Sequence, residues 1–163
     1  MKFSYFLLLG LVIVFFSCNK DSEQTYPNTP SLVLMQQNTD VITIADEESF
    51  LLLKFNFTDG DGDIGRLPTD EDTSFYVTAT YLNDTAAPIN YYFPFPQIGA
   101  NSFQKNGGIA GAVDLYFENA YFFPRRDSAH LSGHDTLNLS IILEDIGGNR
   151  SEVINVGPIY IQP

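Results

Sequence analysis

The chain has 163 residues, which is enough for one ordinary domain with its own hydrophobic core. Its 20 acidic residues against 8 basic ones give a formal net charge of −12. That charge argues against nucleic acid and anionic lipid as partners, and it favours cations or basic partners, or simply solubility. A single cysteine excludes a disulfide within the chain.

The first residues have the pattern of an export signal. Lys2 is followed by an apolar run over residues 3–16, then by Ser17 and Cys18. The run is shorter than the ~20 residues that a transmembrane helix needs, so we expect a helical signal peptide over residues 1–17. The sequence Phe-Phe-Ser-Cys resembles a bacterial lipoprotein processing site, which implies cleavage before Cys18 and attachment of lipid, such as palmitate, to it. Simple secretion is the alternative.

Residues 18–30 form a polar stretch without an apolar period, and we expect them to be a flexible tether. Its residues 20–23, Lys-Asp-Ser-Glu, resemble the charged export signal of surface lipoproteins in Bacteroidota. A generic solvated spacer explains the same residues. The tether would hold the remaining residues, 31–163, away from a membrane as one domain.

Beyond residue 30, apolar side chains recur at every second position, as strands with one buried face require. The first candidate strand is residues 31–35 with 41–44, and the others are residues 50–58, 75–82, 89–95, 111–117, 137–143 and 152–161. Turn-forming clusters separate them, and no amphipathic helix is indicated. This pattern predicts an all-β domain: an immunoglobulin-like antiparallel β-sandwich of about seven strands.

The turn after residue 58 reads Asp59-Gly-Asp61-Gly-Asp63-Ile64-Gly, with three carboxylates at alternate positions. Such carboxylates can converge on one cation while the glycines permit a tight turn, and calcium is the obvious ion. A complete EF-hand is excluded, because Ile64 stands where that loop has its invariant glycine. The alternative is an acidic solvent-exposed loop in which Asp and Gly serve turn geometry only.

A second turn, between the last two candidate strands, carries Asp145 and Asn149 beside two glycines. In an immunoglobulin-like sandwich with the predicted strand order, both turns lie at the same end. We therefore expect Asp145 and Asn149 to complete a metal shell begun by Asp59, Asp61 and Asp63. The tether would enter at that end too, so a bound ion would stiffen its junction with the domain.

The acidic turn, a strand that begins at Gly111 and the closing sequence of residues 139–161 together resemble a group of uncharacterised Bacteroidota lipoproteins. Those proteins have an immunoglobulin-like or cadherin-like domain. The resemblance implies a β-sandwich at the outer membrane and carries no activity. Thr85 and Ser128 each follow Asp and precede Ala, which resembles the O-glycosylation acceptor of that phylum.

Two aromatic clusters are candidates for a contact surface. Tyr91 and Tyr92 lie in the first; Tyr121 and Phe122, followed by Arg125 and Arg126, lie in the second. Neighbouring strand residues point to opposite faces, so some rings must be exposed or covered by a loop. The alternative is that loops fold back and bury these rings.

No catalytic residues are expected, because no nucleophile accompanied by a base and an oxyanion donor is recognisable. The sequence therefore predicts a non-enzymatic, lipid-anchored binding or accessory module of an envelope assembly, with a protein partner and a calcium-ordered end. It would reside at the outer membrane, on either the periplasmic or the cell-surface side. The alternative is a glycan-binding surface lipoprotein that cooperates with a nutrient transporter.

Overall fold

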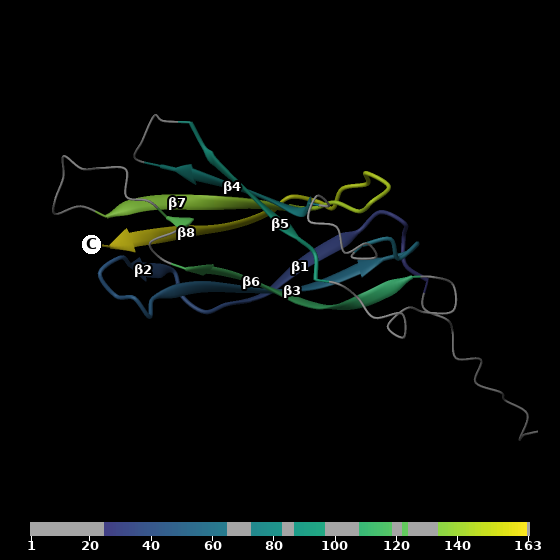
Figure 1. The fold of residues 1–163 in the computed structure, drawn as a ribbon, viewed down its shortest axis with the longest axis horizontal. Helices are drawn as coiled ribbons and strands as arrows, with labels where there is room; N and C mark the ends of the chain where they lie inside the picture. Colours follow the sequence, from purple (N-terminus) through teal and green to yellow (C-terminus); the bar gives the residue numbers. More distant parts are fainter. Residues whose placement is uncertain are drawn as a thin grey trace, which may run out of the picture.

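Two β-sheets pack face to face in the computed structural model, which describes residues 25–64, 73–82, 87–96, 108–118, 122–123 and 134–162 (Figure 1). The strands are β1 (Ser31–Gln37), β2 (Val41–Thr43), β3 (Phe50–Asp59), β4 (Thr73–Tyr81), β5 (Ile89–Pro94), β6 (Ile109–Glu118), β7 (Asp135–Leu143) and β8 (Ile154–Gln162). The predicted all-β sandwich is confirmed.

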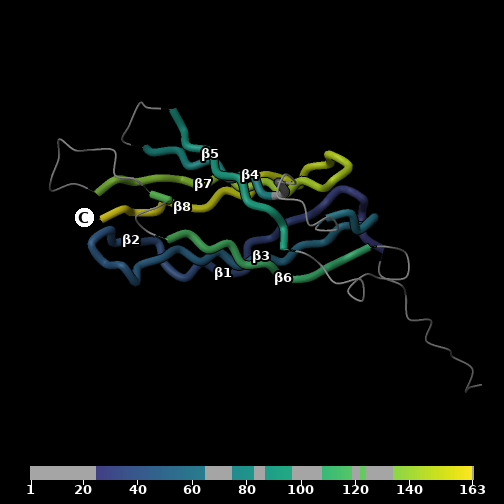
Figure 2. The backbone as a smooth tube through the Cα atoms, in the orientation of Figure 1, coloured from purple at the N-terminus to yellow at the C-terminus, as the bar shows by residue number. Residues whose placement is uncertain are grey.

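The strand order is immunoglobulin-like. One sheet has the order β1-β3-β6 and the other β2-β8-β7-β4-β5. All neighbours run antiparallel except β2 and β8, which run parallel. The N-terminal strand is split, since β1 joins the smaller sheet and β2 crosses to the larger one (Figure 2). This split makes eight strands in the described residues where the sequence indicated about seven.

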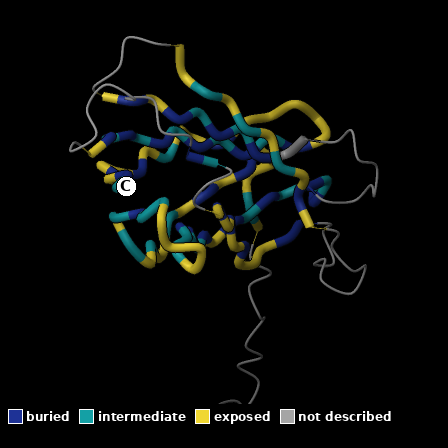
Figure 3. Tube along the Cα trace, turned by 60° about the vertical axis from the view of Figure 1, so that its left-hand side comes forward, coloured by how far each residue is buried: buried dark blue, intermediate teal, exposed yellow. Residues whose placement is uncertain are grey.

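The core follows the period-two pattern of the sequence. Alternate residues of β3 and β7 are buried between the sheets, and their neighbours face outward. Buried and less buried residues alternate along the chain in Figure 3. In β3 the buried positions are Leu51, Leu53, Phe55, Phe57 and Asp59. The last of these is a carboxylate at a position that continues the core-facing series.

One end of the sandwich gathers segments that are distant in the sequence. The end of β3, the start of β1 and the turn between β7 and β8 lie together there, and the C-terminus lies at the opposite end (Figures 1 and 2). Within the described ranges, none of the helical structure reaches the length and apolarity needed to cross a bilayer. The predicted signal peptide, Cys18 and residues 19–24 lie outside the described residues.

Candidate metal centre

The phase of two strands places two carboxylates inside the end of the sandwich. Asp59 continues the inward-facing positions of β3, and Asp145 continues those of β7, two residues beyond Leu143. Both residues are buried, Asp59 with no exposed surface and Asp145 with 5% exposed. A side chain at either position must point between the sheets, where an unpaired charge is costly.

Four carboxylates meet at this end. Asp59, Asp61, Asp63 and Asp145 each offer an oxygen atom, and these four atoms lie within 4.8 Å of one another. Asp59 is the last residue of β3, Asp61 and Asp63 lie in the turn that follows, and Asp145 comes from the turn after β7. Both turns thus lie at one end of the sandwich, as the sequence had indicated. This arrangement could hold a metal ion.

Hydrogen bonds from the backbone curl the first turn. Oδ2 of Asp59 accepts from the backbone N–H of Asp63 at 2.9 Å and from that of Ile64 at 3.4 Å. Gly62 has a φ of 65°, in the left-handed region that glycine adopts at little cost. Ile64 is fully buried and anchors the turn in the core. The turn is therefore held in a curled shape that directs its carboxylates toward one point.

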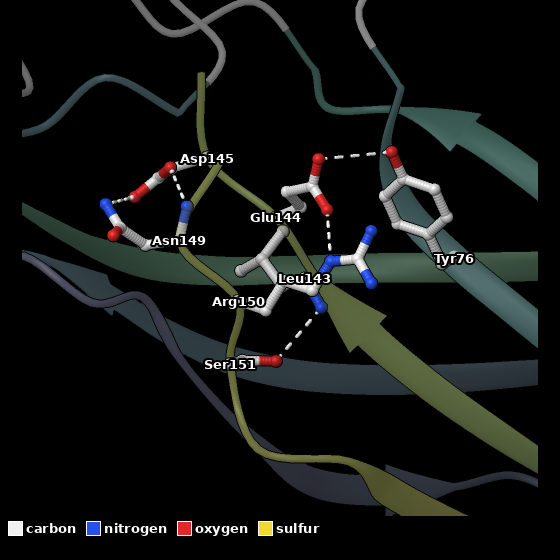
Figure 4. A network of polar contacts seen from close by, with 7 residues as sticks. All are labelled: Tyr76, Leu143, Glu144, Asp145, Asn149, Arg150 and Ser151. Carbon is white, nitrogen blue, oxygen red and sulfur yellow. Dashed lines mark hydrogen bonds and ion pairs between the residues drawn. The ribbon is translucent and has the colours of Figure 1, made fainter. Parts of the chain in front are cut away.

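The second turn fixes Asp145 through Asn149. The backbone N–H of Asn149 donates to Oδ1 of Asp145 at 2.7 Å, and the Asn149 amide Nδ2 donates to Oδ2 at 2.8 Å (Figure 4). These two hydrogen bonds position the carboxylate of Asp145. The role of Asn149 as a metal ligand stays a prediction, which would use its amide oxygen.

A direct hydrogen bond joins the two turns. The backbone N–H of Gly147, between Asp145 and Asn149, donates to Oδ2 of Asp63 at 2.8 Å. A Cβ atom on Gly147 would lie 3.2 Å from Asp145 Oδ1 and 3.4 Å from Asp63 Oδ2. The glycine therefore leaves room for the two carboxylates to approach each other.

Three buried carboxylate oxygens have no hydrogen-bond partner among the described residues. They are Oδ1 of Asp59, of Asp61 and of Asp63. In that same part of the chain, no Lys or Arg forms an ion pair with any of the four aspartates. Buried polar atoms in folded proteins nearly always have a partner, and a cation among the four carboxylates would supply one.

The pKa values of the cluster show the cost of this arrangement. Burial raises the pKa of Asp59 to about 6, and the charges of Asp61 and Asp63 add to the increase. Burial also raises the pKa of Asp63, with further contributions from the charges of Asp145 and Asp61. Both causes would be offset by a cation among the four carboxylates.

A second polar group lies beside the cluster, on the outer face of the larger sheet. Arg150 forms an ion pair with Glu144, and the Tyr76 hydroxyl donates to Glu144 Oε1 at 3.2 Å (Figure 4). The Arg150 guanidinium also lies 5.1 Å from the centre of the Tyr76 ring. These contacts tie the second turn to β4. The sequence analysis did not identify them, because nothing local pairs Tyr76 with a turn so distant in the chain.

The aromatic residues proposed as a contact surface divide into two groups. Tyr91 and Phe122 are half-buried and pack edge-on at 5.5 Å, and the Tyr91 hydroxyl donates to the Phe122 carbonyl. These two side chains pack together and do not form an exposed contact surface, in line with the alternative that the aromatic rings are buried. Tyr92 is 58% exposed and lies edge-on to Tyr76 at 5.6 Å. The remaining predicted site residues lie outside the described residues: Cys18, Thr85, Tyr121, Arg125, Arg126 and Ser128.

Comparisons of the chain with protein-family models, with curated proteins and with solved structures find no match. Inferences about its function therefore rest on the sequence and on the geometry described above.

Proposed function

We propose that this protein is a non-enzymatic, lipid-anchored binding or accessory module of a bacterial outer-membrane assembly, and that the acidic end of its sandwich binds Ca²⁺. The observation that carries the calcium site is that three of the four clustered aspartates each have a buried oxygen without a hydrogen-bond partner among the described residues. The anchor and the outer-membrane location are supported by Cys18 after an apolar run and by the resemblance to Bacteroidota lipoproteins.

Calcium fits the donor atoms of this cluster. All four side chains supply hard carboxylate oxygens, which Ca²⁺ and Mg²⁺ prefer. Asp61 and Asp63 are only partly buried, so water can complete a shell of six to eight ligands around Ca²⁺. Mg²⁺ demands near-ideal octahedral geometry, which four carboxylates on two separate turns are poorly suited to supply. Extracellular calcium modules bind with a Kd of roughly 10⁻⁴–10⁻³ M.

Titration of the protein with Ca²⁺ tests the proposal. We expect a Kd in the range of ~10⁻⁴–10⁻³ M by calorimetry, and a gain of ~1.4 kcal/mol in the free energy of unfolding at ten times the Kd. Asp61→Asn removes one of the four negative charges without disturbing a described hydrogen bond, and it should lower the affinity at least tenfold. Asp114→Asn is the matched control, because Asp114 lies on β6 and pairs with Lys54 at 3.3 Å. Equal affinity in the two variants, or no binding by the wild type, would contradict the calcium site.

A second candidate function, glycan binding, is favoured by the outer face of the larger sheet. Four polar side chains stand in one row across β8, β7, β4 and β5: Asn155, Ser140, Thr78 and Asn90. Ser140 bonds Asn155 Oδ1 at 2.9 Å, and Thr78 bonds Asn90 Oδ1 at 2.9 Å. Among the described residues, neither amide nitrogen donates a hydrogen bond, and Asn90 lies two residues before the exposed Tyr92 on the same face of β5. Amide donors next to an exposed Tyr suit an uncharged sugar chain.

Binding to a panel of neutral glycans tests this second candidate. Tyr92→Ala should abolish any binding, because it removes the exposed ring without touching the core. Tyr116→Ala provides the control, since Tyr116 is 50% exposed but lies on β6 in the other sheet. Glycan binding that survives Tyr92→Ala would exclude this face as the binding site.

A further inference from the structure

The segment before β1 docks directly on the acidic turn. The carbonyl oxygen of Pro27 accepts a hydrogen bond from the backbone N–H of Gly60 at 2.8 Å. Gly60 stands between Asp59 and Asp61, two members of the carboxylate cluster. The same backbone turn therefore carries the candidate cation ligands and the contact with the N-terminal segment.

Glycine is required at position 60 because the backbone of the N-terminal segment approaches it closely. A Cβ atom at this position would collide with the carbonyl oxygen of Tyr26 and would lie 2.6 Å from the carbonyl carbon of Pro27. The contact continues along the chain, because Pro30 is buried and Ser31 pairs with Thr58 at the end of β3. Tyr26 and Pro27 thus lie against the acidic turn, and residues 28–30 lead from there into β1.

We infer that the cation site and this dock form one linked unit, in which a divalent cation at the four aspartates fixes residues 26–30 onto the domain. The inference rests on the proposed cation binding. Without a cation, repulsion among Asp59, Asp61 and Asp63 favours a more open turn, which would swing the N–H of Gly60 away from Pro27. With a cation, both neighbours of Gly60 are held on one ion, and the N–H stays directed at Pro27.

This linkage would set how the domain stands relative to its anchor. Between the proposed lipid on Cys18 and the dock, a chain of the length of residues 18–26 reaches at most about 28 Å. Undocking frees the chain as far as residue 30 and lengthens the span to at most about 42 Å. Calcium would thus hold the acidic end of the sandwich closer to the membrane and restrict its swing.

Amide relaxation in the full chain, in detergent and with calcium or EDTA, tests the inference. With calcium, the amide order parameters of Asn28 and Thr29 should approach the ~0.85 of rigid backbone, and with EDTA they should fall below ~0.6. Asp61→Asn should move this response to calcium concentrations at least tenfold higher. If calorimetry shows that calcium binds but Asn28 and Thr29 do not respond, the linkage is wrong and the calcium site stands. If the wild type binds no calcium, both proposals fail.

Gly60→Ala separates docking from ligation, because it keeps all four carboxylates. Its Cβ should displace Tyr26 and Pro27, so that Asn28 and Thr29 stay mobile with or without calcium. Coupling between sites is reciprocal, so the Kd for calcium should rise about 5-fold or more. An unchanged Kd in a folded Gly60→Ala protein would overturn the linkage. If this variant does not fold, the wild type and Asp61→Asn still decide between the outcomes.

Discussion

Asp59 and Asp145 owe their burial to the phase of β3, which ends at Asp59, and of β7, which ends two residues before Asp145. A β-strand directs alternate side chains inward, and the residue that continues the series beyond the strand end is directed inward as well. At most such positions a domain places an apolar side chain. A carboxylate there costs stability unless hydrogen bonds and a cation satisfy it. Backbone N–H groups satisfy one oxygen of Asp59 and leave the other without a partner among the described residues.

The raised pKa of Asp59 predicts an unusual pH dependence. Between its ordinary value of 3.8 and its folded value of about 6, the folded protein binds more protons than the unfolded one. The free energy of unfolding without calcium should therefore fall as the pH rises across this window, by at most about 3 kcal/mol. Asp63, whose pKa is also raised, acts in the same direction.

Urea unfolding at pH 4.5 and pH 7.5, in EDTA, measures this effect. With saturating calcium, the free energy of unfolding should instead rise with pH, because the cation binds the ionised carboxylates and competes with protons. Asp59→Asn should reduce the change of unfolding free energy with pH in EDTA, because an amide does not titrate. Its oxygen can still accept the hydrogen bonds that Oδ2 of Asp59 accepts. Greater stability at pH 7.5 than at pH 4.5 in EDTA would contradict the inward, ionisable placement of Asp59.

At the scale of elements, the turn between β7 and β8 is held by a side chain that the sequence analysis did not single out. Ser151 is 7% exposed, and its hydroxyl accepts a hydrogen bond from the backbone N–H of Leu143 at 2.9 Å. The hydroxyl also donates to the Glu152 carbonyl at 3.0 Å, and the Ser151 N–H donates to the Leu143 carbonyl. The serine thereby closes the base of the turn that presents Asp145 (Figure 4).

Ser151→Ala should lower the free energy of unfolding by about 1–3 kcal/mol, because it leaves the buried N–H of Leu143 without a partner. Calcium affinity should fall as well, since the base of the turn that positions Asp145 loosens. Urea unfolding and calorimetry give the two quantities. The control is Ser140→Ala on the exposed face of the same strand, β7, for which we expect a change within about 0.5 kcal/mol. Equal effects of the two changes would show that the Ser151 hydroxyl has no special role.

At the scale of the whole molecule, the two ends of the sandwich differ. The carboxylate cluster and the docked N-terminal segment share one end, and the C-terminus lies at the other (Figure 1). With an anchor at Cys18, the acidic end would face the membrane. The outer sheet faces and the far end would then remain accessible to a protein partner or a glycan.

Cys18→Ser tests the anchor, because a serine cannot carry the thioether-linked lipid. We expect the wild-type protein to incorporate labelled palmitate and to fractionate with membranes. The variant should incorporate none, and most of it should be lost from the membrane fraction. Ser17→Ala keeps a small residue before the cysteine and should behave as the wild type does. A wild-type protein that takes up no palmitate would reduce the proposal to simple secretion.

Most of the fold could be predicted from the sequence, because period-two alternation is a local signal. The alternation at Leu51, Leu53, Phe55 and Phe57 marks both a strand and its buried face without any knowledge of the neighbouring strands. The three aspartates of the first turn were identifiable for the same reason, since their spacing alone indicates that they can converge. The split of the first strand into β1 and β2 was not, because joining opposite sheets is a property of the assembled sandwich.

The sequence by itself therefore determined the all-β class, the buried faces and the acidic turn. Only the tertiary structure decided that Asp145 completes the cluster while Asn149 orients it, that Tyr92 is displayed while Tyr91 packs, and that Pro27 docks on Gly60. These outcomes join residues far apart in the chain. They depend on strand register and on the close approach of backbones, which local patterns do not encode.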